Sequence, residues 1–412
     1  MDTTSTREAA LARLAQFLPA AGRRYAETRN ADDGPGEGSG SGNVSQLSPW
    51  LRAGLIGAPE VLSAVLGQHS PRAAEKFVAE VFWRIYFKGY LEQRPEIWDD
   101  YRKGLAGALA GHERNAGIRT AYAEAIEGRT GIEAFDVWAR ELAETGYLHN
   151  HARMWFASIW IFTLKLDWRL GADFFLKHLM DADAASNTLS WRWVAGLHTK
   201  GKHYLARADN IARYTAGRAG GPLAAEGLAE HAEPLTESHD HPRRKLDLPA
   251  PPSAADLARP FALLLHDEAA HRAPLALPAK PALVIGAARP EARSPGGAGA
   301  FARHFAQGAL ASGMTEAAAA FGCPAVEWRA GEPLAPLLAD AGIDRIALPY
   351  LPTGWTRDAL WPDLATLAAA GQVVTLLGDL DRATWPLAKA GFFPVAKAIE
   401  GLLAECGIAE AG

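Results

Sequence analysis

Cysteine is scarce in this sequence, since only Cys323 and Cys406 occur among 412 residues. Two thiols so far apart supply neither a disulfide framework nor the four ligands of an iron–sulfur cluster. No run of about 18 apolar residues occurs, so no membrane span is expected. The N-terminal stretch MDTTSTREAALARLAQFL lacks the basic start and the apolar block of a signal peptide. These absences predict a protein of a reducing, cytoplasmic compartment.

Excess positive charge is also missing. The formal net charge is −5 at pH 7, which argues against a protein that coats DNA. The balance changes along the chain, because residues 1–220 carry 27 Lys and Arg against 25 Asp and Glu, whereas the remainder carries 15 against 22. An anionic ligand is therefore expected to meet the first half of the chain.

Hydrophobic patterning divides the chain into unlike parts. The first half shows long amphipathic runs typical of helices, and a polar, Pro-rich stretch follows it. Thereafter the short apolar runs FALLLHDE, PALVIG, PAVEWR, RIALPY and VVTLLGD alternate with helical segments. We therefore expect a multidomain α and α/β protein: a helical domain over residues 1–218, a linker over 219–260 and a parallel, Rossmann-like α/β domain over 261–412.

The first predicted helix spans residues 1–30 and includes Tyr25. A Gly- and Ser-rich loop follows it. The loop ends at NVSQLSPWLRAGL, where Ser48 and Pro49 are typical of a helix N-cap and first helical residue. Backbone N–H groups at such a terminus, with the hydroxyls of Ser45 and Ser48, form a natural phosphate cradle. A plain helix cap is the alternative interpretation.

The stretch EVFWRIYF places Glu80, Trp83, Arg84 and Phe87 on one helical face. A carboxylate within an otherwise aromatic face is costly unless it is paired or used. The pattern favours either a ligand contact or an exposed edge with an ion pair, and leaves both open.

Polar residues gather at the start of the predicted helix in LHNHARMWFASIW, where Asn150 and Met154 share a face. His149 and His151 point in different directions and no third ligand has suitable spacing, so no metal site is expected. Farther along, DADAASNTLSWRW carries two acidic residues that can hydrogen-bond a ligand. Three nearby tryptophans fit a hydrophobic core better than a cofactor contact: Trp155, Trp160 and Trp168.

Six motifs, taken in order over residues 20–215, resemble the FAD-binding domain of the DNA photolyase and cryptochrome family. They are YAETRN, VSQLSPWL, EVFWRIYF, EGRTG, TGYLHNHARM and LDWRLGADFF with LMDADAASNTLSWRW. The resemblance implies an all-helical fold and a bound FAD. It also has departures, since Ala125 and Tyr147 stand where the family has Trp, and His151 stands where it has Arg.

The family's cofactor contacts fall on defined positions of this sequence. The residues implied to hold the FAD phosphates and ribitol are Tyr25, Ser45, Leu47 and Ser48. Arg153 and Asp181 would form a buried pair over the flavin, with Asp183 close to the isoalloxazine ring. Asn187 matches the residue that faces flavin N5.

The resemblance further implies light-driven repair of damaged DNA, in which excited, reduced FAD splits a flipped-out cyclobutane pyrimidine dimer by electron transfer. The residues implied to contact the dimer are Glu80, Trp83, Arg84, Asn150, Met154 and Trp193. Glu80 and Asn150 would stabilise charge on the thymine carbonyls. Trp191 and Trp168 match the inner two members of an electron-transfer triad, and no residue matches the outer one.

Two alternatives remain open at this point. A cryptochrome-like blue-light photoreceptor would bind FAD and signal through a partner, and a flavoprotein of another kind would use the domain as a scaffold. FALLLHDEAAHRAPLAL resembles the first strand of the family's antenna domain, which precedes the FAD domain in the family. We therefore expect either an antenna-like domain in rearranged order or an unrelated Rossmann-like domain, with no antenna chromophore assigned.

Overall fold

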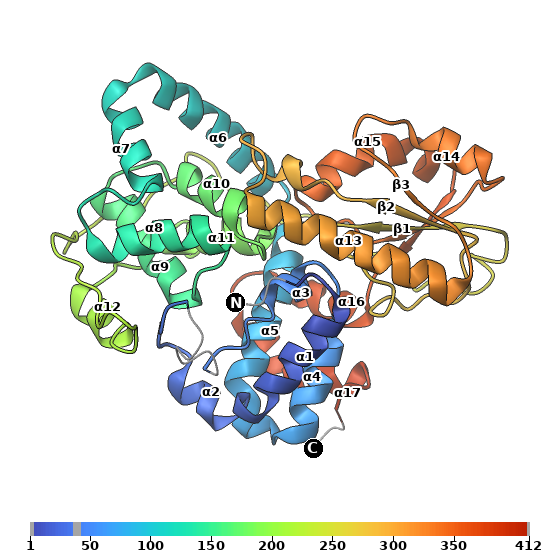
Figure 1. Cartoon of the computed structure of the whole chain (residues 1–412), viewed down its shortest axis with the longest axis horizontal. Coiled ribbons are helices and arrows are strands. Elements are labelled where there is room, and N and C mark those ends of the chain that lie inside the picture. Colours follow the sequence, from blue (N-terminus) through green and yellow to red (C-terminus); the bar gives the residue numbers. More distant parts are fainter. Residues whose placement is uncertain (1–3, 36–42, 410–412) are drawn as a thin grey trace.

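The computed structural model describes residues 4–35 and 43–409, and it places a mostly helical part before a parallel sheet (Figure 1). The predicted order of a helical region followed by an α/β region is confirmed. The helices of the first part are α1 (Arg7–Phe17), α2 (Arg23–Thr28), α3 (Ser48–Arg52), α4 (Ala58–Gln68), α5 (Pro71–Glu92), α6 (Glu96–Arg114), α7 (Ala116–Ile126), α8 (Glu133–Thr145), α9 (Asn150–Ser158), α10 (Trp168–His178), α11 (Ala184–Ala195) and α12 (Ala208–Tyr214).

Two helices are shorter in the structure than the sequence pattern predicts. The helix expected over residues 1–30 is broken by a 3-10 turn at Leu18–Ala20, where Pro19 lacks the N–H that an α-helix requires. The long helix expected after Asn150 ends at Ser158 and passes into a π-helical turn, Ile159–Thr163, in which the Leu164 N–H bonds the Ile159 carbonyl.

A five-stranded parallel sheet forms the second part, in the order β3-β2-β1-β4-β5. Its strands are β1 (Ala262–His266), β2 (Leu283–Ala287), β3 (Ala325–Glu327), β4 (Ile346–Pro349) and β5 (Val373–Leu376). Helix α13 (Ala300–Phe321) covers one face, whereas α14 (Leu334–Asp340) and α15 (Trp355–Ala369) cover the other (Figure 1). Strands β1 and β2 are buried along their whole length, which explains why they read as continuous apolar runs.

The hydrophobic core does not divide where the sequence pattern changes. One cluster fills the helical bundle around Trp155, Trp160 and Trp168, as their apolar surroundings predicted. A second cluster joins the N-terminal helices, one face of the sheet and the C-terminal helices α16 (Asp379–Thr384) and α17 (Phe393–Glu405). Helix α17, the last helix of the chain, contacts α5 as well as α16. The last helix of the described chain therefore packs against the N-terminal helical part (Figure 1).

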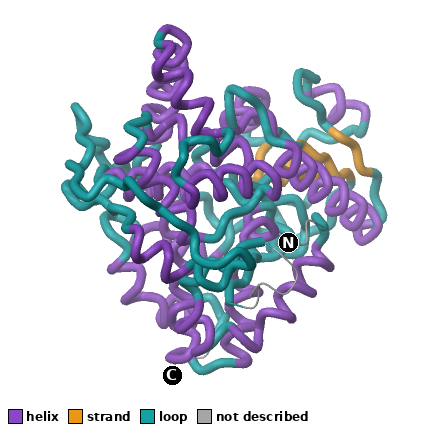
Figure 2. Tube along the Cα trace, turned by 60° about the vertical axis from the view of Figure 1, so that its left-hand side comes forward, coloured by secondary structure: helices purple, strands orange, loops and turns teal. Residues whose placement is uncertain are grey.

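Residues 219–260, expected as a linker, form neither helix nor strand but pack on the helices; Figure 2 draws such irregular chain in teal. Leu223 and Ala225 are buried in the core of the helical bundle. Farther along, Leu246 and Leu248 pack against the second core. This segment therefore covers the helical part instead of spacing two free domains.

The carboxyl end of β1 docks on the helical part through buried charges. Arg52 of α3 donates from Nη1 to the Asp267 carbonyl at 2.8 Å. Lys88 of α5 pairs with Glu268 at 2.8 Å. Burial alone would raise the pKa of Glu268, but the Lys88 and Arg52 charges outweigh it and lower the pKa to about 2. Both contacts hold the sheet against the helices that carry the predicted ligand residues.

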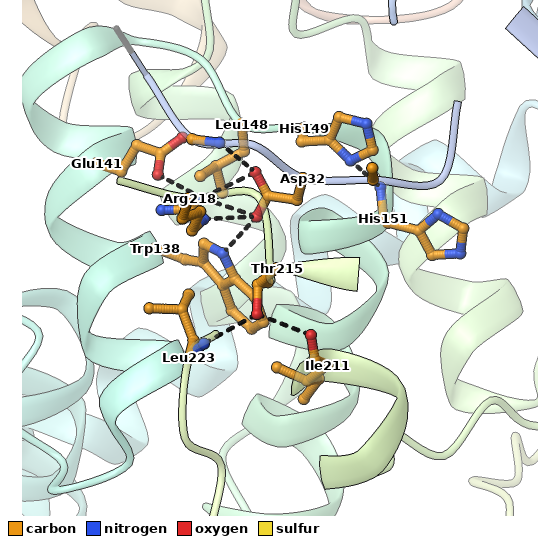
Figure 3. Close-up of polar contacts among 12 residues, drawn as sticks. Asp32, Trp138, Glu141, Leu148, His149, His151, Ile211, Thr215, Arg218 and Leu223 are labelled. Atoms are coloured by element: carbon orange, nitrogen blue, oxygen red, sulfur yellow. Dashed lines mark hydrogen bonds and ion pairs between the residues drawn. The ribbon is translucent and has the colours of Figure 1, made fainter. Parts of the chain in front are cut away.

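Arg218 ties the chain after α2 to the helical bundle (Figure 3). Its Nη2 lies 2.7 Å from Asp32 Oδ2 and 2.8 Å from Glu141 Oε2. Trp138 Nε1 also donates to Asp32 Oδ2 at 2.9 Å. Burial raises the pKa of Glu141 to about 7, although Arg218 opposes the shift. This buried cluster fixes the segment that follows the Tyr25 helix.

Among the residues that the structure describes, no helix combines the length and apolar character needed to cross a lipid bilayer.

Candidate functional site

A cavity of about 530 Å³ lies within the helical part and is lined by α2, α3, α5, α9, α10 and α11. Such a volume is in the range typical of small-molecule and cofactor sites. The predicted site residues that line it are Tyr25, Ser45, Ser48, Glu80, Trp83, Arg84, Asn150, Arg153, Met154, Asp181, Asp183, Asn187, Trp191 and Trp193. Residues drawn from five separate motifs thus meet around one space.

Two predicted site residues, Leu47 and Trp168, do not line this cavity. Leu47 is fully buried in the second core and its N–H bonds Ser45 Oγ at 3.3 Å. It is also the N-cap of α3, so Ser48 is the first helical residue and not the N-cap expected from the sequence. Trp168 packs in the bundle core against Tyr101, with ring centroids 5.8 Å apart.

Arg153 and Asp181 form an ion pair at the cavity wall. Arg153 Nη2 lies 2.8 Å from Asp181 Oδ2, and Arg153 Nε donates to the Leu148 carbonyl at 2.9 Å. Burial alone would lower the pKa of Arg153, but the Asp181 charge outweighs it and the pKa is raised. Asp181 Oδ1 is buried and has no hydrogen-bond partner among the residues that the structure describes. The pair is therefore held firmly and keeps one acceptor for a ligand.

Helix α11 begins at the second acidic residue of DADAASNTLSWRW. Asp183 is its N-cap and accepts from the Ser186 N–H at 2.7 Å, while Arg84 Nε lies 3.7 Å from its other oxygen. One turn later, Asn187 donates from Nδ2 to the Ala172 carbonyl of α10 at 2.9 Å. These bonds fix the side chains of Asp183 and Asn187 at the wall of the cavity.

Glu80, the carboxylate on the aromatic face of α5, is paired with Arg29 at the end of α2. Burial alone would lower the pKa of Arg29, but the Glu80 charge outweighs burial, so the pKa is raised. Burial raises the pKa of Tyr25 well above its ordinary range, and Glu80 adds to the effect. Arg29 was missed as a site residue, although it stands one turn after Tyr25 in YAETRN.

The rings of Trp83 and Trp193 make part of the cavity wall aromatic. Trp193 stacks on Tyr204 with centroids 5.7 Å apart. Trp83 stacks on Phe392, with centroids 4.0 Å apart and an angle of 15° between the planes. Phe392 comes from the C-terminal region, and no signal in the sequence connects it with Trp83. One face of the Trp83 ring is therefore already covered.

Trp191 also lines the cavity, and it is enclosed by aromatic rings. Its centroid is 5.1 Å from that of Phe175 and 6.3 Å from that of Trp160. Gly171 of α10 makes room for it, because a Cβ there would lie 2.7 Å from Trp191 Cζ3. Trp191 Nε1 is buried without a protein partner.

The residues present fit a flavin nucleotide. Three guanidinium groups at the wall, from Arg29, Arg84 and Arg153, suit a diphosphate and polar ring edges. The unpartnered Asp181 Oδ1 and Trp191 Nε1 can accept from and donate to a polar ring or sugar. The apolar remainder of the wall suits a flat aromatic ring system.

Fold and site thus define a helical domain that encloses a cofactor-sized cavity with arginine, carboxylate and aromatic walls. Residues 77–217 match the family described as the FAD binding domain of DNA photolyase. The deoxyribodipyrimidine photo-lyase of Streptomyces griseus is 34% identical over 228 residues, which are 52% of this chain and 47% of the relative. A deoxyribodipyrimidine photo-lyase of Thermus thermophilus is 36% identical over 190 residues, which are 46% of this chain and 42% of the relative.

Among solved structures, a bacterial class III photolyase from Agrobacterium tumefaciens is 28% identical, with a TM-score of 0.42 over 51% of this chain and 42% of that chain. This chain spans about half the length of the curated relatives it matches. Over residues 77–217 it carries the FAD-binding domain of the DNA photolyase and cryptochrome family.

Proposed function

We propose that this chain is a light-driven DNA-repair flavoprotein that splits cyclobutane pyrimidine dimers, with FAD held in the cavity. The observation that supports this most strongly is the cavity itself. Residues matched to cofactor contacts and residues matched to lesion contacts line the same space of about 530 Å³. A lesion drawn against the aromatic part of its wall would lie beside the cofactor.

In this proposal the cofactor is bound from both sides of the cavity. Tyr25, Ser45 and Ser48 hold the phosphates and ribitol, and Arg29 adds a cation beside them. Leu47 acts only through packing, because its side chain is in the core. The residues that orient the flavin ring are Arg153, Asp181, Asp183 and Asn187.

The chain's own part in repair is to hold the lesion and to exclude water. Trp83, Met154 and Trp193 offer the stacking surface, while Asn150 donates its side-chain N–H to a pyrimidine carbonyl and Glu80 accepts from a pyrimidine ring N–H. Arg84, which also lines the cavity, adds a positive charge for the DNA that carries the lesion. FAD, when bound and reduced, supplies the light-driven electron that opens the cyclobutane ring.

Trp191 and Trp168 are proposed to serve reduction of the cofactor rather than repair. Only Trp191 lines the cavity. Trp168 is buried next to Tyr101, so a route to the surface would continue through this ring.

A cryptochrome-like photoreceptor is the second candidate, and the stacking of Phe392 on Trp83 favours it. A receptor needs no surface for a flipped base, whereas a repair enzyme must use the remaining face of Trp83 or displace Phe392. The negative net charge of the chain points in the same direction.

The two candidates are separated by the binding of DNA that carries one thymine dimer. For a repair enzyme, Trp83→Ala should weaken binding about tenfold or more, since stacking on an aromatic side chain contributes ~1–3 kcal/mol per base. Bound FAD should be retained. Trp361→Ala, at a tryptophan of α15 that is 38% exposed, is the matched control and should bind like the parent. Equal affinity of the parent for damaged and undamaged DNA would instead support the photoreceptor.

A further inference from the structure

A cluster of metal-ligating side chains lies outside the cavity, where the segment after α12 crosses α6. His239 and His241 stand two apart in an irregular stretch of chain, and both reach Asp100 of α6. His239 Nε2 lies 2.6 Å and His241 Nε2 lies 2.8 Å from the same atom, Asp100 Oδ2. Ser238 and His239 form a bend, so the two rings converge on one atom of the helix through the local fold of this segment.

The other nitrogen of each ring also lies near an oxygen. His241 Nδ1 is 3.7 Å from Glu237 Oε2, and His239 Nδ1 is 3.3 Å from Ser238 Oγ. Metal-binding histidines typically donate their second N–H to such an oxygen, which fixes the ring and its tautomer. Glu237 is itself held by Arg192 of α11, whose Nη2 lies 2.7 Å from Oε2.

We propose that Asp100, His239 and His241 bind a divalent transition-metal ion, with zinc as the best match. Two imidazole nitrogens and one carboxylate oxygen suit zinc and its neighbours, whereas calcium and magnesium prefer oxygen ligands throughout. Three protein ligands leave a fourth position for water or another small ligand. The sequence-based expectation of no metal site considered only His149 and His151, which lie elsewhere.

Binding requires a small and defined change. With zinc about 2.0–2.2 Å from each ligand, tetrahedral geometry separates the ligand atoms by roughly 3.3–3.5 Å. The two rings would therefore move back from Asp100 by less than ~1 Å. The N–H protons that now face Asp100 would transfer to the Nδ1 atoms, where Glu237 and Ser238 can accept them. The His239 side chain is 58% exposed, so this side of the site is free to adjust.

The position of the site indicates a structural role. Further contacts already attach the same segment to the helices: Arg244 pairs with Glu96 of α6 at 2.5 Å, and Lys200 pairs with Asp240. A metal at Asp100 would lock the covering segment to α6 and, through Glu237 and Arg192, to α11, which lines the cavity.

The test uses the full chain without a histidine tag, freed of metal with a chelator and titrated with Zn²⁺ by calorimetry. We expect a single site of micromolar or tighter affinity, a rise in Tm of a few degrees with saturating Zn²⁺, and no comparable effect of Mg²⁺ or Ca²⁺. Co²⁺ should bind to the same site and give the visible absorption typical of a tetrahedral ion.

Variants assign the ligands. His241→Ala and Asp100→Asn should each weaken Zn²⁺ binding about 100-fold, and Glu237→Gln about tenfold, as loss of an orienting partner does. His231→Ala removes another histidine of the same segment and should bind Zn²⁺ like the parent. The proposal is overturned if the folded parent binds no Zn²⁺, since the cluster is then only a set of hydrogen bonds. It is equally overturned if His241→Ala binds Zn²⁺ as tightly as the parent.

Discussion

Gly171 permits the packing of Trp191, and Gly171→Ala tests this contact directly. A Cβ at this position would lie 2.7 Å from Trp191 Cζ3, closer still to Cη2, and 2.9 Å from Trp160 Cε2. Ordinary van der Waals contact begins near 3.4 Å, so Trp191 must retreat by slightly more than an ångström to relieve the contact with Cη2. Phe175 and Trp160 stand against the ring, with centroids at 5.1 and 6.3 Å, and restrict that retreat.

The expected cost follows from two opposing effects. Overpacking of a close-packed core destabilises by ~1–3 kcal/mol, and at a contact this short we expect the upper part of that range. Replacing Gly by Ala within a helix favours folding by ~1 kcal/mol. The net prediction is a loss of about 1–2 kcal/mol in the free energy of unfolding, measured by urea denaturation with fluorescence and circular dichroism.

Gly107→Ala provides the matched control, because it is the same substitution in α6 with no atom within 4 Å of the new Cβ. It should leave stability unchanged or raise it by ~1 kcal/mol. A Gly171→Ala variant as stable as Gly107→Ala would refute the packing described here around Trp191.

Two further predictions concern buried charge. Arg218→Met leaves the carboxylates of Asp32 and Glu141 buried without their cation, so the free energy of unfolding at pH ~7.5 should fall by ~3–5 kcal/mol, with Arg218→Lys less affected. A loss under ~1 kcal/mol in urea denaturation would show that this cluster is not a tight buried network. Burial lowers the pKa of His198 to about 4, so the folded chain excludes a proton that the unfolded chain binds below pH ~6.5. Stability should therefore fall as pH drops from ~6.5 toward 4, by at most ~1.4 kcal/mol per pH unit from this residue, and His198→Gln should flatten the fall. Parallel stability curves for His198→Gln and the parent between pH ~7 and ~5 would contradict this assignment.

Helical periodicity predicted correctly that four side chains share one face of a helix. It placed Glu80, Trp83, Arg84 and Phe87 on one face of a helix, and all four line the cavity. The strands could also be predicted from the sequence, because the strands of a parallel sheet covered on both faces are short, continuous apolar runs. Family resemblance added what periodicity lacks, namely that motifs far apart in the chain meet around one cavity.

Contacts between residues far apart in the chain could not be predicted from the sequence. Phe392 covers Trp83 from a distant part of the chain, and no local pattern encodes such a pair. The contact of Asp100 with His239 and His241 could not be predicted either. The two-residue spacing of the histidines indicates a metal site only when α6 is known to lie beside them. The shift of the α3 start from Pro49 to Ser48 is smaller, since helix ends vary by a residue or two.

The shared core also explains why a change of sequence pattern near residue 260 is a weak guide to independent units. The N-terminal helices, one face of the sheet and α17 are buried together. Lys88 and Glu268 add a buried ion pair across the same junction. We infer that the sheet and the helices that line the cavity unfold together.

A repair assay measures whether the cavity holds FAD beside a flipped pyrimidine dimer, as we propose. The purified chain, chemically reduced, is mixed with a short DNA that carries one thymine dimer, and the sample is divided between blue light and darkness. We expect loss of the dimer in the lit sample alone. An unchanged dimer in both samples, with FAD demonstrably bound and reduced, would contradict the proposal.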